Sequence, residues 1–462
     1  MSRDKELSGG KGYTEEITPT EARKVLAVAS IGNLIDYYDF FIAASAASLV
    51  WPTIYIQPAV GGNPSLALAI SIATYGIAFL ARPLGAFIFG HIGDKIGRQS
   101  TLVLTLLLAF VGVLGIGLLP PYSSIGIASV ILLFVLRFIL GLGFGGEWGG
   151  GATWFTEFAY RRGELGLYSA IYNILGQLGI AIASIAFTAV GLLLPRPALL
   201  DWGWRILFYI GAAALVIGAI IRYLFRESPV FLKIKKSAQI ARYPAAEVLR
   251  YYAGKILLLA GSWFYITAIM SGLAQTFAFA YISALAKGSP IGGLPPATVG
   301  TLGVSIGYIV ALFTVVLASG IILDKKRPSP KIFFYISTIA SAVITPIFFL
   351  LVNSLDLTTI ILAYIMLTMV VIIPTSVQAY WYTKEFEAKY RYSGSGLAYQ
   401  FGGLFGGIFI TFILPSIIAL APSVVQAWPY VTAAYSIASI ISLICTILVR
   451  ETKGSEKELY ER

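Results

Sequence analysis

The sequence predicts an all-α membrane protein in which twelve transmembrane helices form two six-helix halves, with both termini in the cytoplasm. The chain is 58% hydrophobic and only 12% charged, with a mean hydropathy of +0.82, whereas soluble domains carry about 25% charged residues. Its apolar runs reach the roughly 20 residues that a spanning helix needs, and they do not alternate as the strands of a membrane barrel would. Two charged loops also recur along the chain, which indicates two related halves.

The basic residues predict the topology rather than nucleic-acid binding, although the net charge is +11. With both termini on one side of the membrane, that side holds 28 of the 33 Lys and Arg residues. The other side holds only Arg196, Arg205 and Lys287, and two more lie inside spans. Such an excess marks the cytoplasmic side. We therefore expect a multi-pass protein of the plasma membrane, surrounded by lipid and with no nucleic-acid partner.

Short polar breaks delimit the expected spans. They cover residues 25–51, 66–90, 100–119, 124–148, 165–194, 203–225, 255–286, 297–323, 332–352, 357–383, 393–420 and 427–449. The chain then divides into a cytoplasmic tail (1–24), an N-terminal bundle (25–225), a cytoplasmic linker (226–254), a C-terminal bundle (255–449) and a second tail (450–462).

The two halves repeat each other in their charged loops. Asp94 in GHIGD matches Asp324 in GIILD at an offset of 230 residues, and Glu157 matches Glu385 at an offset of 228. Parallel halves of this kind are related by an axis along the membrane normal, and the substrate site lies between them near the midplane.

The first span contains two aspartates, Asp36 and Asp39, in an otherwise apolar run. Each ionised carboxylate at the bilayer centre costs about 2.5–3.5 kcal/mol on insertion scales. Because residues three apart share a helix face, the two acids must be partnered, be protonated or face a wet cavity.

The second and fourth spans add cations and glycines. Arg82 lies about eight residues before the cytoplasmic end of its span, which runs into a loop whose glycines at 90, 93 and 97 permit a tight turn. Arg137 lies near the membrane centre, and Glu147 lies two to three turns further toward the cytosol. The glycines between 141 and 151 allow close helix contact or hinging.

These charges predict that the first half binds and releases the coupling proton. Five ionisable groups lie deep in the first half, whereas the spans of the second half offer aromatics, hydroxyls and amides. Three carboxylates and two guanidiniums leave one negative charge, which a proton on an aspartate would neutralise. We assign proton coupling to Asp36, Asp39, Arg137 and Glu147. The alternative is that the five groups form structural ion pairs, although buried pairs stabilise poorly compared with apolar packing.

Several motifs together resemble the major facilitator superfamily and, within it, the metabolite:proton symporter family. The superfamily's loop signature is similar to GHIGDKIGRQ (90–99), with Lys95 and Gln99 as departures. The narrower family's pattern is similar to GNLIDYYDF (32–40), ARPLG (81–85), GGEWGG (145–150), WGWR (202–205) and RESPVF (226–231). The resemblance covers nearly the whole chain. It implies alternating access and transport of osmolytes or organic acids.

The resemblance also implies roles for particular residues. The cytoplasmic loops would form a latch that holds the halves together in one state of the cycle, comprising Gly90, Asp94, Arg98, Glu157, Arg161, Asp324, Glu385 and Arg391. Arg137 matches the family's fourth-span arginine, which is tied to coupling, so Arg82 is the arginine expected to touch substrate. The other expected substrate contacts are the aromatic and amide side chains Tyr37, Tyr172, Asn173, Gln177, Tyr265, Gln275, Tyr308, Gln378 and Tyr399.

We expect a proton-coupled symporter that takes up a small carboxylate-bearing metabolite as a monomer, with the proton as coupling ion and no other cofactor or metal. A proton-coupled drug or metabolite antiporter and a proton-independent sugar facilitator remain alternatives, although the fifth span lacks the proline bend of antiporters. One His, one Cys and no nucleophile motif argue against an intramembrane enzyme. Charges confined to one half argue against a symmetric channel.

Overall fold

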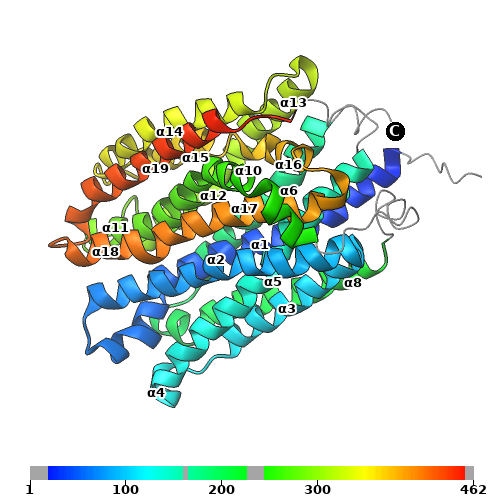
Figure 1. The fold of residues 1–462 in the computed structure, drawn as a ribbon. Coiled ribbons are helices and arrows are strands. Elements are labelled where there is room, and N and C mark those ends of the chain that lie inside the picture. Colours follow the sequence, from blue (N-terminus) through cyan, green and yellow to red (C-terminus); the bar gives the residue numbers. More distant parts are fainter. Residues whose placement is uncertain (1–18, 160–164, 226–243, 453–462) are drawn as a thin grey trace, which may run out of the picture.

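The computed structural model describes residues 19–159, 165–225 and 244–452. Within these ranges, twelve helices are long and apolar enough to cross a membrane. The first and last described segments lie at the same end of the elongated bundle (Figure 1). We call this the charged end, because the carboxylates of Asp94, Glu157, Asp324 and Glu385 lie there.

The first half consists of six long helices. They are α1 (Pro19–Leu49), α2 (Pro64–Lys95), α3 (Arg98–Leu118), α5 (Ile127–Ala159), α6 (Leu165–Leu193) and α8 (Trp204–Tyr223). The short helices α4 (Tyr122–Ile125) and α7 (Arg196–Ala198) lie in the connections at the opposite end. Helix α2 packs against α5, α1 packs against α6, and α3 packs against α5 and α8.

The second half repeats this plan with several divided helices. They are α10 (Pro244–Thr267), which continues through the π-helical stretch Ala268–Phe277 into α11 (Ala278–Leu285); α12 (Pro296–Ala311) with α13 (Leu317–Lys326); α14 (Lys331–Val352); α15 (Leu357–Val371) with α16 (Thr375–Lys384); α17 (Arg391–Ile408) with α18 (Leu414–Leu420); and α19 (Trp428–Leu448). Helices α2 and α17 lie side by side where the halves meet, and α6 contacts α12, α13 and α16 (Figure 1).

Several helices extend beyond the expected spans. Helix α2 continues to Lys95, α5 continues to Ala159, and α10 begins at Pro244, inside the segment predicted as linker. Hydropathy reports only the apolar part of a helix. The extensions of α2 and α5 carry Asp94 and Glu157, which contact the other half, whereas the extension of α10 carries Glu247, which accepts a hydrogen bond from Tyr390 of its own half. Residues 226–243 of the linker and the tail residues 1–18 and 453–462 lie outside the described ranges.

The turn predicted after the second span contains only one of the three glycines expected to form it. Gly97, with φ of +147°, leads into α3 in a conformation that favours glycine. Gly90 and Gly93 instead lie within α2, where an added Cβ would meet Ser393 and Tyr392 of α17. These two glycines therefore allow close contact between the halves, and only the third makes the turn.

Candidate functional site

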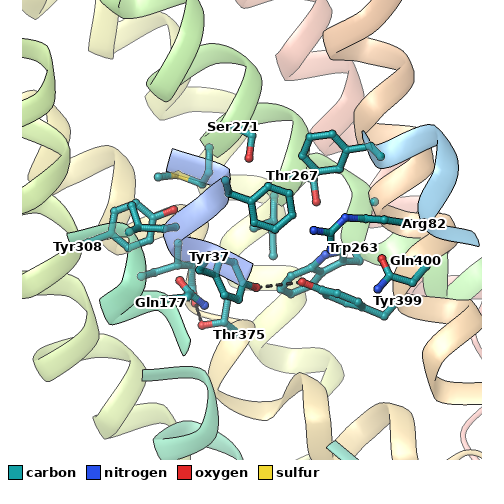
Figure 2. A pocket seen from close by; sticks show the side chains of 17 residues that line it. Tyr37, Arg82, Gln177, Trp263, Thr267, Ser271, Tyr308, Thr375, Tyr399 and Gln400 are labelled. Carbon is teal, nitrogen blue, oxygen red and sulfur yellow. Dashed lines mark hydrogen bonds between the residues drawn. The ribbon is translucent and has the colours of Figure 1, made fainter. Parts of the chain in front are cut away.

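A cavity lies between the two halves, midway along the bundle (Figure 2). Helices α1, α2 and α6 line one side of it, and α10 with the π-helical stretch that follows it, α12, α16 and α17 line the other. Its polar side chains are those of Tyr37, Arg82, Gln177, Trp263, Thr267, Ser271, Tyr308, Thr375, Tyr399 and Gln400. The hydroxyls of Tyr37 and Tyr399 are 2.9 Å apart and join the halves across it.

The first buried ion pair joins the cavity wall to α1. Arg82 donates from Nη2 and Nη1 to the two carboxylate oxygens of Asp36, at 2.5 and 3.1 Å. Its guanidinium lies 4.2 Å from the ring centroid of Phe40. Arg82 and Asp36 are each 1% exposed, and Arg82 lines the cavity. A planar cation that already holds one carboxylate bidentately therefore faces the space between the halves.

The second pair lies within the first half, away from this cavity. Arg137 Nη1 is 3.2 Å from Asp39 Oδ2, and Arg137 Nη2 donates to the carbonyl oxygen of Tyr75 at 3.1 Å. Asp39 borders a small, mostly apolar void that Tyr38 and Leu207 also line. Among the described residues, its Oδ1 atom has no hydrogen-bond partner. The two aspartates thus share a helix face but bind different arginines.

A third pair corrects the expected charge balance. Glu147 binds Arg222 of α8, with Oε1 2.5 Å from Nη2 and Oε2 2.7 Å from Nη1. Both side chains are fully buried, and Thr105 Oγ1 also donates to Glu147. Arg222 lies inside the sixth helix and was not among the predicted deep ionisable groups. Three carboxylates therefore face three guanidiniums, so the expected single cluster with one negative charge is wrong.

Five of the ten predicted substrate contacts line the cavity, namely Tyr37, Arg82, Gln177, Tyr308 and Tyr399. Four of the others do not line the cavity and form hydrogen bonds within their own half. Tyr172 donates to the carbonyl of Trp148, Asn173 to that of Ser169, Tyr265 to Ser337 Oγ, and Gln275 to the Tyr308 hydroxyl. Gln378 is buried in α16 and is not part of the lining. Residue type alone does not distinguish a side chain facing the cavity from one facing its own half.

The cavity also contains residues that are not among the ten predicted substrate contacts. Trp263, Thr375 and Gln400 reach it from the second half, and Phe40 and Phe79 reach it from the first. The ring planes of Phe40 and Phe79 are 18° apart, with their centroids separated by 5.0 Å. Phe40 is close in sequence to Asp36, and Phe79 is close to Arg82. This proximity is the one sequence signal that could have predicted the two phenylalanines at the cavity.

At the charged end, carboxylates join the halves directly. Asp94 of α2 accepts hydrogen bonds from the backbone and hydroxyl of Ser393 in α17, at 3.0 and 2.6 Å. Asp324 of α13 accepts from the backbone amides of Gly166 and Leu167 in α6, each at 2.7 Å.

The other predicted latch residues lie at the same end. Glu157 lies between two arginines, 3.5 Å from Arg98 and 3.7 Å from Arg391. Glu385 binds Lys255 within the second half, at 2.7 Å. Arg161 lies outside the described residues, where no contact can be assigned to it. Among the described residues, no group of His, Cys, Asp and Glu side chains converges as a metal site would.

The sequence is similar to a known family of transporters and to several of its members. Residues 25–255 match the family model of sugar (and other) transporters. An inner membrane metabolite transport protein of Escherichia coli is 38% identical over 58% of this chain and 61% of its own length. A predicted metabolite transport protein of Haemophilus influenzae is 30% identical over 96% of this chain and 98% of its own length. The shikimate transporter of Escherichia coli is 29% identical over 86% and 88%, respectively.

Solved structures identify the fold. The proton:xylose symporter XylE of Escherichia coli, a major facilitator superfamily protein, superposes with a TM-score of 0.67. The alignment covers 95% of this chain and 98% of the symporter, at 16% sequence identity. The twelve helices in two halves are thus the major facilitator fold.

Proposed function

The chain belongs to the sugar (and other) transporter family of the major facilitator superfamily, and we propose that it couples proton entry to uptake of a small carboxylate-bearing metabolite. The family membership makes the protein a multi-pass membrane transporter rather than an enzyme. Its relative in Escherichia coli is an inner membrane protein, so we place this chain in the plasma membrane. The coupling ion and the substrate charge are our proposal, and the monomeric state remains an expectation.

The Asp36–Arg82 pair at the cavity wall is the observation that carries this proposal. A guanidinium stays charged at all physiological pH values, so only the carboxylate of the pair can titrate. When Asp36 takes a proton, Arg82 loses its counter-ion while remaining buried. A substrate carboxylate in the cavity then satisfies Arg82 with the same bidentate geometry. Proton and substrate therefore bind best together, which is the condition for symport.

The Asp39–Arg137 pair gives the cycle a second titratable group that does not touch the cavity. Arg137 is held by the carbonyl of Tyr75 on α2 as well as by Asp39 on α1. A proton on Asp39 would weaken the link between these two helices. Glu147 plays no part in this scheme, because Arg222 neutralises it within the first half.

The relatives support different parts of the proposal. The shikimate transporter carries a carboxylate by its name, and the xylose symporter couples sugar movement to protons. A proton-independent sugar facilitator, which is one of the two alternatives, would have no use for a buried Arg–Asp pair at its cavity. A panel of neutral sugars and carboxylates distinguishes the two.

Uptake by proteoliposomes under an imposed pH gradient tests the proposal. The wild-type protein should accumulate a carboxylate when the outside is acidic, and Asp36→Asn should abolish accumulation because it mimics the protonated pair permanently. The same variant should retain counterflow exchange, since Arg82 is still free to bind substrate. Asp356→Asn, at an exposed helix start in the second half, is the matched control. Full accumulation by Asp36→Asn, or uptake of sugars only, would contradict the proposal.

A further inference from the structure

We infer that Gln400 determines which carboxylates the cavity accepts, because its amide oxygen accepts a hydrogen bond from a hydroxyl or N–H group of the substrate. The inference rests on the proposed function, since it concerns a second contact of the molecule whose carboxylate Arg82 binds. Gln400 belongs to α17 and lines the same cavity as Arg82 and Tyr399 (Figure 2).

The orientation of the Gln400 amide is fixed by its neighbours. Its Nε2 atom donates to the backbone carbonyls of Phe144 and Gly145 in α5, at 3.2 and 3.0 Å. Carbonyl oxygens only accept hydrogen bonds, so the amide atom beside them must be the NH2 group. The remaining atom, Oε1, is therefore an acceptor held in place by contacts with the opposite half.

This oxygen is buried and lacks a partner. Gln400 is fully buried, and among the described residues no group donates to its Oε1 atom. Buried acceptors in proteins are nearly always satisfied by protein, water or ligand. The amide nitrogen is already used, so the amide cannot turn to satisfy its oxygen without losing two hydrogen bonds.

There is room for at least a methyl group next to this oxygen. A Cβ atom added at Gly403, one turn further along α17, would lie 3.7 Å from Gln400 Oε1 and 3.8 Å from Phe79, with nothing nearer. At Gly402 and Gly406 on the same helix, an added Cβ would instead collide with α10. Gly403 lines the cavity, so this space is part of the substrate's volume.

The donor requirement narrows the substrate class. A hydroxylated carboxylate satisfies both Arg82 and Gln400, whereas a quaternary ammonium carboxylate such as glycine betaine has no donor and a neutral sugar has no carboxylate. An acceptor that is already positioned loses little conformational freedom on binding. An analogue without the donor leaves the buried oxygen unsatisfied, and we expect it to bind about tenfold more weakly.

Calorimetric titration of the purified protein with two matched pairs of probes tests the inference. The first pair is shikimate and 1-cyclohexene-1-carboxylate, which lacks the three hydroxyls. The second is dimethylglycine, whose protonated amine carries one N–H, and glycine betaine. In any pair that binds, the donor-bearing member should bind about tenfold more tightly to the wild-type protein, and Gln400→Met should abolish this preference.

Two further variants separate the acceptor from the helix contact. Gly403→Ala fills the space beside Oε1 but leaves the bonds to α5 intact, so it should also reduce the preference. Gln99→Met removes an amide that likewise donates to two consecutive carbonyls, those of Arg222 and Tyr223 at 3.0 and 3.1 Å, but lies away from the cavity. It should leave the preference unchanged.

The outcomes distinguish this inference from the proposed function. Equal binding of both members of each pair, or a preference that survives Gln400→Met, would overturn the role of Gln400 while leaving carboxylate transport intact. Absence of binding and of gradient-driven uptake for every carboxylate would instead overturn the proposed function, and this inference with it.

Discussion

At the scale of single residues, three buried arginine–carboxylate pairs of the first half lie away from the charged end and differ in their surroundings. Asp36–Arg82 faces the cavity and Asp39–Arg137 borders a small void. Glu147–Arg222 is enclosed by α1, α3, α5 and α8, and Arg222 Nη2 also donates to the carbonyl of Ala29 at 2.9 Å. Among the described residues, only Asp36–Arg82 borders the cavity between the halves, so it is the pair that we propose to serve transport.

The enclosed pair predicts a stability effect. Glu147→Gln should lower the free energy of unfolding by about 3–5 kcal/mol, because it leaves Arg222 buried without a counter-ion. Adding Arg222→Met to it should restore part of the loss. The measurement is thermal unfolding of the purified protein in detergent. Lys389→Met is the control, since both side chains of the Lys389–Glu387 pair are exposed and the pair should contribute at most about 1 kcal/mol. Equal effects of both variants would show that burial does not decide the cost.

At the scale of helices, the glycine-rich stretch of α5 makes a close contact with α17 of the other half. An added Cβ at Gly149 would lie 2.5 Å from the Cα atom of Gly396 in α17, whereas one at Gly396 would lie 3.6 Å from that of Gly149. Trp148 stacks on Tyr399 beside this contact, with ring centroids 4.1 Å apart. Tyr392 donates to the carbonyl of Gly146 at 2.8 Å. Gly149 thus serves contact between the halves, whereas Gly141 and Gly143 serve close packing against α2 and α3 within the first half.

Because an added Cβ atom collides at Gly149 and fits at Gly396, we expect alanine substitutions at these two positions to have different effects on stability and transport. Gly149→Ala should weaken the contact between α5 and α17 by about 1–3 kcal/mol, as overpacking does, and slow transport. Gly396→Ala should be tolerated, because its methyl group fits and alanine favours the helix by about 1 kcal/mol. Transport rate and melting temperature of both variants are the measurements. A transport defect of equal size in both would mean that glycine flexibility, rather than the space between the helices, is what matters.

At the scale of the whole molecule, the described residues show the halves in contact at both ends. Asp94 and Asp324 join them at the charged end, and Ser184 and Thr188 of α6 bind Thr301 of α12 toward the other. The cavity lies between these two sets of contacts. Alternating access requires each set of contacts to break in turn.

The Asp324 contact predicts how the charged end opens. Its carboxylate accepts from the first turn of α6, where backbone amides lack helical partners and a negative charge is favoured. Asp324→Asn should weaken this contact and increase hydrogen exchange in the first turn of α6. Asp356→Asn is the control, because Asp356 begins α15 within one half, where hydrogen bonds from Thr359 hold its pKa below the usual range. Unchanged exchange in α6 would rule out a latch at Asp324.

Much of the fold could be predicted because it depends on local properties of the chain. The number of spans follows from apolar length, and the two halves follow from the recurrence of charged loops, since the bilayer imposes a helix on each apolar run. The deep charges Asp36, Asp39, Arg82 and Arg137 stand out against an apolar background for the same reason. Relatives and solved structures bear out the superfamily and the fold.

The sequence by itself thus determined the architecture, the class of protein and the helices that carry its charges. Only the tertiary structure decided which arginine pairs with which carboxylate. Glu147 and Arg222 are 75 positions apart, and no sequence pattern connects the two residues. The tertiary structure likewise placed Gln400 at the cavity and Tyr265 away from it, although both are polar residues in apolar helices. Helix rotation and packing set the direction of each side chain, and these depend on contacts distant in sequence.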